Sequence, residues 1–71
     1  MSLAMVENGK RVRLLGVKAG CELRSRLSVL GLIPGVEIEM IQNLANGPVV
    51  IGLNGSRLML GRGMAQKIIV R

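Results

Sequence analysis

The alternation of apolar and polar positions changes its period near the middle of the chain, where a helical pattern gives way to a strand pattern. Leu23, Leu27 and Leu30 are spaced i, i+4 and i+7, so they share one face of a short helix. Gly31 follows the last of them and is suited to the left-handed conformation that ends many helices. The pattern therefore predicts one short helix with a buried leucine stripe, closed at Gly31 by a Schellman motif.

A tight turn and a strand follow this helix. Pro34 and Gly35 suit the two central positions of a type II turn, because proline fixes a negative φ and glycine accepts the positive φ that comes next. After the turn, Val36, Ile38 and Met40 alternate with Glu and Ile positions. This alternation predicts a strand with one largely apolar face.

A hairpin is predicted over residues 49–60. Two apolar runs flank Asn54-Gly55, which matches the two-residue type I′ turn of hairpins. Gly52, inside the first run, indicates a bend or a bulge. The register imposed by the turn pairs Leu53 with Ser56, Ile51 with Leu58 and Val49 with Leu60.

The remaining segments complete a small, mainly β domain. Residues 3–6 form an apolar lead-in, residues 11–14 alternate as a half-buried strand, and residues 68–70 supply a last strand after a turn over 61–66. A sheet this small hides its apolar face by curling into a barrel. The prediction is one domain spanning 1–71, a small SH3-like barrel of about five to six short strands with one short α-helix.

Two motifs together resemble the FeoA family, the small cytosolic accessory proteins of bacterial ferrous iron transport. One is Arg-Leu-x-x-Leu-Gly-Leu-x-Pro-Gly over residues 26–35, and the other is the tail over residues 58–70, an apolar strand, a turn with Met-Ala and a final strand. The resemblance extends from Leu3 to Val70 and implies the SH3-like fold. It also implies a partner, the FeoB transporter, which such a protein would bind and modulate through its cytosolic G-protein domain or its membrane part.

The charge of the chain is strongly positive. Ten Lys and Arg against four acidic residues give a net charge of +6, with no basic run longer than two. This balance fits an RNA-binding barrel, a protein held near an anionic membrane, or a solvated basic surface without a dedicated ligand. The absence of aromatic residues argues against single-stranded nucleic acid, whose bases usually stack on such rings. We therefore expect no specific nucleic acid partner, with a small basic RNA-binding barrel kept as an alternative.

The composition leaves little for catalysis or for a metal site. The chain has no His, Tyr or Asp, so its candidate groups reduce to four Glu and one thiol. Cys21 lacks a His partner and is interpreted as a small buried or half-buried hydrophobe. Glu37 and Glu39 share a strand face, but no group of three or four ligands appears, so they are expected to be solvated and paired with arginines. The chain is predicted to be no enzyme, with no cofactor and no metal site beyond weak, non-specific binding.

We expect the protein to be located in the cytoplasm. The beginning lacks the features of a signal peptide, no window approaches a membrane span, and a single cysteine fits a reducing compartment. Membrane proximity would come through the transporter, and self-association through exposed strand edges is left open. A further alternative is a detached relative of the SH3-like domain of metal-dependent, DtxR-type transcriptional regulators.

Four residues around the helix are predicted to contact the partner. Arg24 and Arg26 lie on the helix, and Leu32 and Ile33 lie at its exit. The alternative is that they are ordinary surface and core positions. Arg26 is expected to lay its stem along apolar surface with its charge in solvent. Four methionines, at positions 5, 40, 59 and 64, are expected to fill the core.

Overall fold

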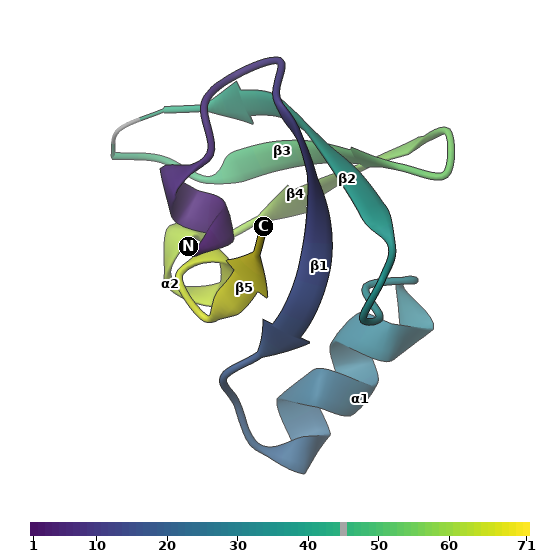
Figure 1. The fold of residues 1–71 in the computed structure, drawn as a ribbon. Helices are drawn as coiled ribbons and strands as arrows, with labels where there is room; N and C mark the ends of the chain where they lie inside the picture. Colours follow the sequence, from purple (N-terminus) through teal and green to yellow (C-terminus); the bar gives the residue numbers. More distant parts are fainter. Residues whose placement is uncertain (45) are drawn as a thin grey trace.

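The structure, a computed structural model, describes residues 1–44 and 46–71. These residues form one antiparallel sheet of five strands in the order β4-β3-β2-β1-β5. Figure 1 shows β1 running down the front of the molecule, with α1 below it and the two termini close together. In chain order, the elements are η1 (Leu3–Met5), β1 (Arg11–Val17), α1 (Cys21–Val29), β2 (Glu37–Asn43), β3 (Val49–Leu53), β4 (Ser56–Leu60), α2 (Arg62–Ala65) and β5 (Ile68–Val70).

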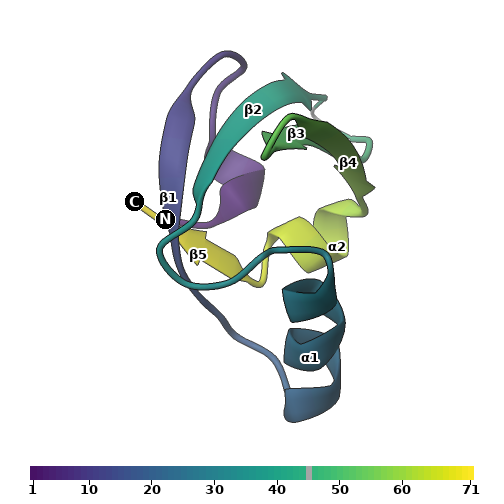
Figure 2. The same ribbon diagram turned by 90° about the vertical axis from the view of Figure 1, so that its right-hand side faces the viewer.

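The sheet curls around its apolar face. Figure 2 shows the molecule turned by 90°: β2, β3 and β4 arch over α2 and β5, and β1 lies at the left, on the side away from α2. The N-terminal segment extends the curl, because the Val70 amide donates to the Met1 carbonyl at 2.8 Å and Ser2 pairs with Ile69. The predicted mainly β fold with a short helix is confirmed, with the strand count at the lower end of the predicted range.

Two bulges bend the sheet where it curls. In β1 the pairing with β5 skips Leu15, and in β2 the pairing with β3 skips Ile41. A bulge locally increases the twist of its strand, which small barrels need. Gly52 lies against the second bulge, since a Cβ on it would lie 3.3 Å from Cδ1 of Ile41. The bend or bulge predicted at Gly52 is thus in β2, the strand that faces it, and the missing side chain of Gly52 leaves room for Ile41.

Helix α1 ends as the sequence predicts. The amide of Leu32 donates to the Leu27 carbonyl and that of Gly31 to the Ser28 carbonyl, both at 2.9 Å, which is the Schellman pair of bonds. Gly31 has a φ of +96°, in the region that favours glycine. The stripe, however, is shorter than predicted: Leu27 is buried, but Leu30 is 48% exposed, because the chain turns away at Gly31 and leaves Leu30 at the rim.

Both predicted turns are present. Gly35 has a φ of +94° and the Val36 amide donates to the Ile33 carbonyl at 3.2 Å, as a type II turn requires. Asn54 and Gly55 both have positive φ, 51° and 82°, which gives the type I′ hairpin. The register predicted for the hairpin, from Leu53–Ser56 to Val49–Leu60, is confirmed in full.

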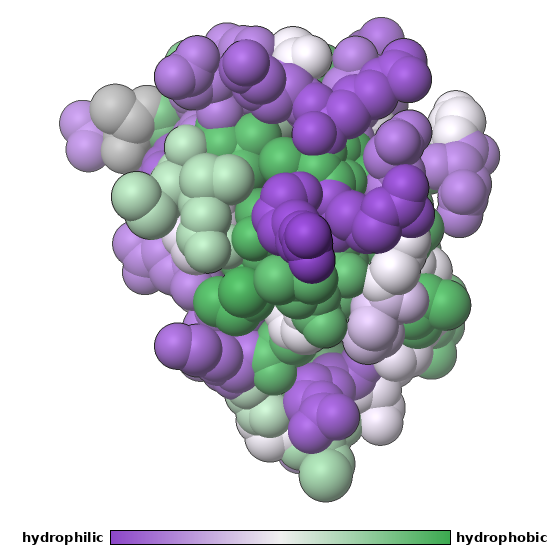
Figure 3. All heavy atoms as spheres, viewed as in Figure 1, coloured by the Kyte–Doolittle hydropathy of each residue, from purple (hydrophilic) through white to green (hydrophobic). Residues whose placement is uncertain are grey.

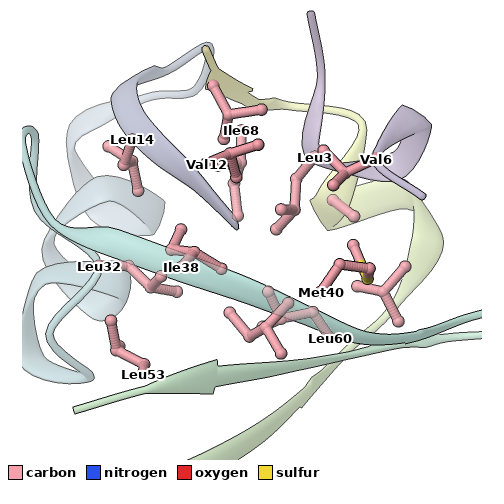
Figure 4. Close-up of a cluster of buried hydrophobic side chains, with 14 of the residues drawn as sticks. Leu3, Val6, Val12, Leu14, Leu32, Ile38, Met40, Leu53, Leu60 and Ile68 are labelled. Atoms are coloured by element: carbon pink, nitrogen blue, oxygen red, sulfur yellow. The ribbon is translucent and has the colours of Figure 1, made fainter. Parts of the chain in front are cut away.

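The core is aliphatic. Side chains from β1, β2, β3 and the N-terminal segment point toward one another, among them Leu14, Ile38 and Leu53 (Figure 4). Met40 is fully buried and Met64 is partly buried against the core. The prediction for the other two methionines is wrong, because Met5 and Met59 are each 71% exposed.

Candidate partner-binding surface

Three apolar side chains stand in solvent where α1 ends, and we call them the helix-exit patch: Val29, Leu30 and Ile33. Their exposed fractions are 87%, 48% and 49%. Figure 3 shows hydrophobic surface at its right edge, over the last turn of α1. Large apolar side chains that gather at one place on the surface of a small domain indicate a contact site for another molecule.

The prediction that Leu32 contacts a partner is wrong. Leu32 is only 2% exposed, because it folds back into the core as the last residue of the Schellman motif. Ile33, the other apolar residue predicted there, is exposed and belongs to the patch. Val29 and Leu30 were missed, since an apolar residue at a helix end gives no sequence signal of its exposure.

The two predicted arginines lie on different sides of α1. Arg26 precedes Val29 by three residues and Leu30 by four, so it lies beside the patch. Arg24 lies on the other flank of Leu27, and its carbonyl accepts a 3.0 Å bond from the Ser28 hydroxyl. Both side chains are in exposed positions. Only Arg26 is therefore placed together with the exposed apolar residues.

The Arg26 side chain extends largely into solvent, and its charge lies there as predicted. It is 74% exposed and its Nη2 lies 3.3 Å from Oε1 of Glu22, one helical turn earlier. An exposed pair at this spacing contributes about 0.5 kcal/mol or less. The guanidinium of Arg26 is therefore held only weakly and can exchange Glu22 for an acidic group on another molecule.

A concave region elsewhere on the surface carries mixed charge. It is a groove of about 560 Å³ between β1–β2 and the β3–β4 hairpin. Nη1 of Arg11 lies 3.9 Å from Oε1 of Glu37, as expected for an acid paired with an arginine of a neighbouring strand. Glu39 is also exposed, and Arg57 lies on the far wall. Both carboxylates and both guanidiniums face solvent, so the groove has no desolvated group that would select a ligand.

The structure offers little to a metal or to covalent chemistry. Over residues 1–44 and 46–71, no three His, Cys, Asp or Glu residues come together. The prediction that Cys21 is buried or half-buried is wrong. It is exposed, because it is the first residue of α1 and points away from the domain's core.

Arg62, in the segment predicted as a turn over residues 61–66, joins three segments of the chain. Nε of Arg62 donates to the Gly47 carbonyl at 3.0 Å, and its Nη2 donates to Oδ1 of Asn43 and to the Leu44 carbonyl. Nδ2 of Asn43 in turn donates to the carbonyls of Ala4 and Val6, at 2.9 and 2.7 Å. We call this the Arg62–Asn43 network. It fixes the end of β2 against η1 and α2, so Arg62 is a structural residue.

In the described parts of the chain, no helix is long and apolar enough to cross a bilayer. A family model described as the FeoA domain matches residues 1–71. The chain belongs to the FeoA family.

Individual relatives agree with this assignment. The chain is 40% identical over 68 residues to a protein of Methanocaldococcus jannaschii named "Putative Fe(2+) transport protein A", covering 96% of this chain and 82% of that protein. It is 28% identical to a crystal structure of an iron uptake regulatory protein (FeoA), with a TM-score of 0.93, covering 100% of this chain and 95% of the other. A sequence relative and a solved structure thus support the same family as the family model.

The SH3-like prediction is confirmed by a more distant FeoA structure. The zinc-complexed FeoA of Stenotrophomonas maltophilia, described as a procaryotic SH3 domain protein, is 21% identical with a TM-score of 0.86, covering 100% of this chain and 89% of that one. A manganese-dependent transcriptional repressor matches with a TM-score of 0.84 at 14% identity, over 39% of its own chain. That likeness shows the fold alone, so FeoA family members and such repressors share a barrel.

Proposed function

We propose that this FeoA-family chain is a non-enzymatic cytoplasmic accessory protein that binds a FeoB-type ferrous iron transporter and modulates it. The helix-exit patch with Arg26 is the contact surface. The observation that carries the proposal is the joint exposure of Val29, Leu30 and Ile33 in a chain of this family. Membership in a ferrous iron transport family supports the choice of partner.

The chemistry of the patch suits a protein partner. Exposed aliphatic groups at its centre gain free energy when another apolar surface covers them, at about 25 cal/mol per Å². Arg26 lies at the border, where a charge contributes more to orientation and association rate than to affinity. The complementary surface on the transporter is an apolar groove with an acidic residue at its edge.

The test is a pull-down of the folded protein with the FeoB-type transporter of the same organism, both full-length and as its cytosolic domain, in each nucleotide state. Val29→Glu places a charge at the centre of the patch and is expected to abolish binding. Arg26→Glu reverses the border charge and is expected to weaken binding about tenfold. Circular dichroism of each variant checks that the fold is retained.

Arg24→Glu is the matched control. It makes the same charge change on the same helix, two residues away and on the other flank of Leu27. It is expected to retain most of the binding. Equal losses in Arg24→Glu and Arg26→Glu would contradict the placement of the surface. No binding by the folded wild-type chain to either transporter form would contradict the proposed function itself.

The structural likeness to a repressor domain favours one other candidate, a detached module acting with a DtxR-type regulator. In that case the same patch would bind the regulator and not the transporter. A pull-down against such a regulator, run beside the transporter, distinguishes the two functions.

A further inference from the structure

Two pairs of like charges lie directly opposite each other on the ladder of β1 and β5. Arg13 and Arg71 exchange both backbone bonds, each at 3.0 Å, and the Lys18 amide donates to the Lys67 carbonyl at 2.7 Å. Their neighbours Leu14 and Val70 pair with each other and are buried. Because side chains alternate between the faces of a strand, Arg13 and Arg71 project outward together. All four basic residues occupy exposed positions.

Like charges placed directly opposite each other destabilise a sheet. The two ion pairs found among the described residues use Arg11 and Arg26. Glu37 lies opposite Arg13 on β2, but its carboxylate is paired with Arg11, so none of the four basic side chains on the ladder is in an ion pair. Nη1 of Arg13 donates to the Gly35 carbonyl at 2.7 Å, which leaves its charge in place. Glu22 lines the same shallow pocket as Lys67, but it is paired with Arg26.

Apolar side chains lie between the two basic pairs. Leu15, at the bulge, is 49% exposed, and Ile69, opposite the bulge, is half-buried. Figure 3 views this side of the molecule: hydrophobic surface gathers over β5 and the lower part of β1, with hydrophilic side chains above it and below it. We call these residues the β1–β5 basic face: Arg13, Leu15, Lys18, Lys67, Ile69 and Arg71.

We propose that the β1–β5 basic face docks directly on the anionic headgroups of a lipid bilayer. A bilayer presents phosphates spread over a plane, which suits basic groups at both ends of a strand ladder. Leu15 and Ile69, between them, are placed to enter the boundary of headgroups and acyl chains. The face shares no residue with the helix-exit patch, and bilayer docking does not depend on binding to a transporter.

Co-sedimentation with protein-free vesicles tests the proposal. Wild-type protein is expected to sediment with vesicles of phosphatidylcholine and phosphatidylglycerol in equal parts, and not with pure phosphatidylcholine. Binding should fall as salt rises, since exposed charges are screened. No binding of folded protein to the anionic vesicles at low salt would overturn the proposal, and leave the transporter pull-down unaffected. Capture by an acidic polypeptide without capture by vesicles would assign the face to an acidic protein.

Lys67→Glu separates docking from folding. It puts a carboxylate opposite Lys18, which turns a repulsive pair into an attractive one, and in the same shallow pocket as Glu22, which repels it. The two effects oppose each other, so the midpoint of thermal unfolding should change little. Vesicle binding should nevertheless fall by about fivefold or more, the effect expected for one basic group at the surface. A variant that keeps its stability but binds less cannot be explained by loss of fold.

Lys10→Glu is the control for net charge. Lys10 is exposed just before β1, at the end of the strand away from its ladder with β5. The change in net charge equals that of Lys67→Glu, and binding should fall clearly less. Equal losses in both variants would show attraction by overall charge and would overturn the docking face.

Discussion

Nη2 of Arg62 donates to Oδ1 of Asn43 at 2.6 Å, and this bond joins the first turn of α2 to the last residue of β2. The amide of the same Asn43 side chain donates to two carbonyls of the N-terminal segment. Three segments far apart in sequence therefore meet at two side chains. Since both are partly buried, each lost partner leaves polar groups without a bond.

Arg62→Lys is expected to destabilise the domain by about 1–2 kcal/mol, because an ammonium cannot reproduce the planar fork that reaches Gly47 and Asn43 together. Asn43→Ala should cost about 2 kcal/mol, since it also frees the carbonyls of Ala4 and Val6. Urea unfolding of both single variants and of the double variant measures the coupling. We expect about 1 kcal/mol or more of coupling, and additive losses would contradict the network.

Gly31, which ends α1, and Gly35, in the turn that follows, should differ in how well each tolerates replacement by alanine. Gly31 and Gly35 have similar positive φ values, 96° and 94°. A Cβ on Gly31 would lie 3.3 Å from Cδ2 of Leu53, whereas one on Gly35 would meet nothing within 4 Å. Each change to Ala carries about 1 kcal/mol of backbone strain, and Gly31→Ala adds a crowding cost. Thermal unfolding should rank Gly31→Ala below Gly35→Ala, and the reverse order would contradict the tight approach of α1 to β3.

Local signals predicted most of this fold correctly. The Schellman end at Gly31 and the hairpin at Asn54-Gly55 each depend on backbone conformations that few residues adopt. Alternation then fixed which side of β3 and β4 is buried, and the observed register agrees. Such features are decided within a few residues, so the chain's sequence is sufficient to predict them.

The candidate site was harder to predict because it depends on distant packing. Leu30 and Leu32 lie on either side of the same glycine, yet one is half exposed and the other is buried. Helical periodicity placed Leu30 with the core and could not show that the chain turns away there, so that α1 buries Leu27 and only part of Leu23. The Arg62–Asn43 network also lacked a signal, because its bonds span sequence separations of 15 residues and more, and most of their acceptors are backbone carbonyls.

The exposure of Cys21 can be tested by chemical modification. Because the thiol stands in solvent at the start of α1, a small disulfide reagent should modify the native protein at a rate within about threefold of that in denaturant. A native rate lower by about a hundredfold would show that the thiol is buried. The reaction should also leave the unfolding midpoint nearly unchanged, since no packed neighbour is displaced.

Val29 and Leu27 provide the sharpest contrast between the patch and the core. They are two residues apart on α1, with exposed fractions of 87% and 1%. Val29→Ser should change the free energy of unfolding by less than about 0.5 kcal/mol, as for other surface positions. Leu27→Ala should cost about 3 kcal/mol, because it leaves a cavity under the helix. Urea unfolding measures both, and a large loss in Val29→Ser would mean that Val29 supports the fold. If Val29→Ser is as stable as expected and still binds the transporter more weakly, the loss must come from the contact itself, since nothing inside the domain has changed.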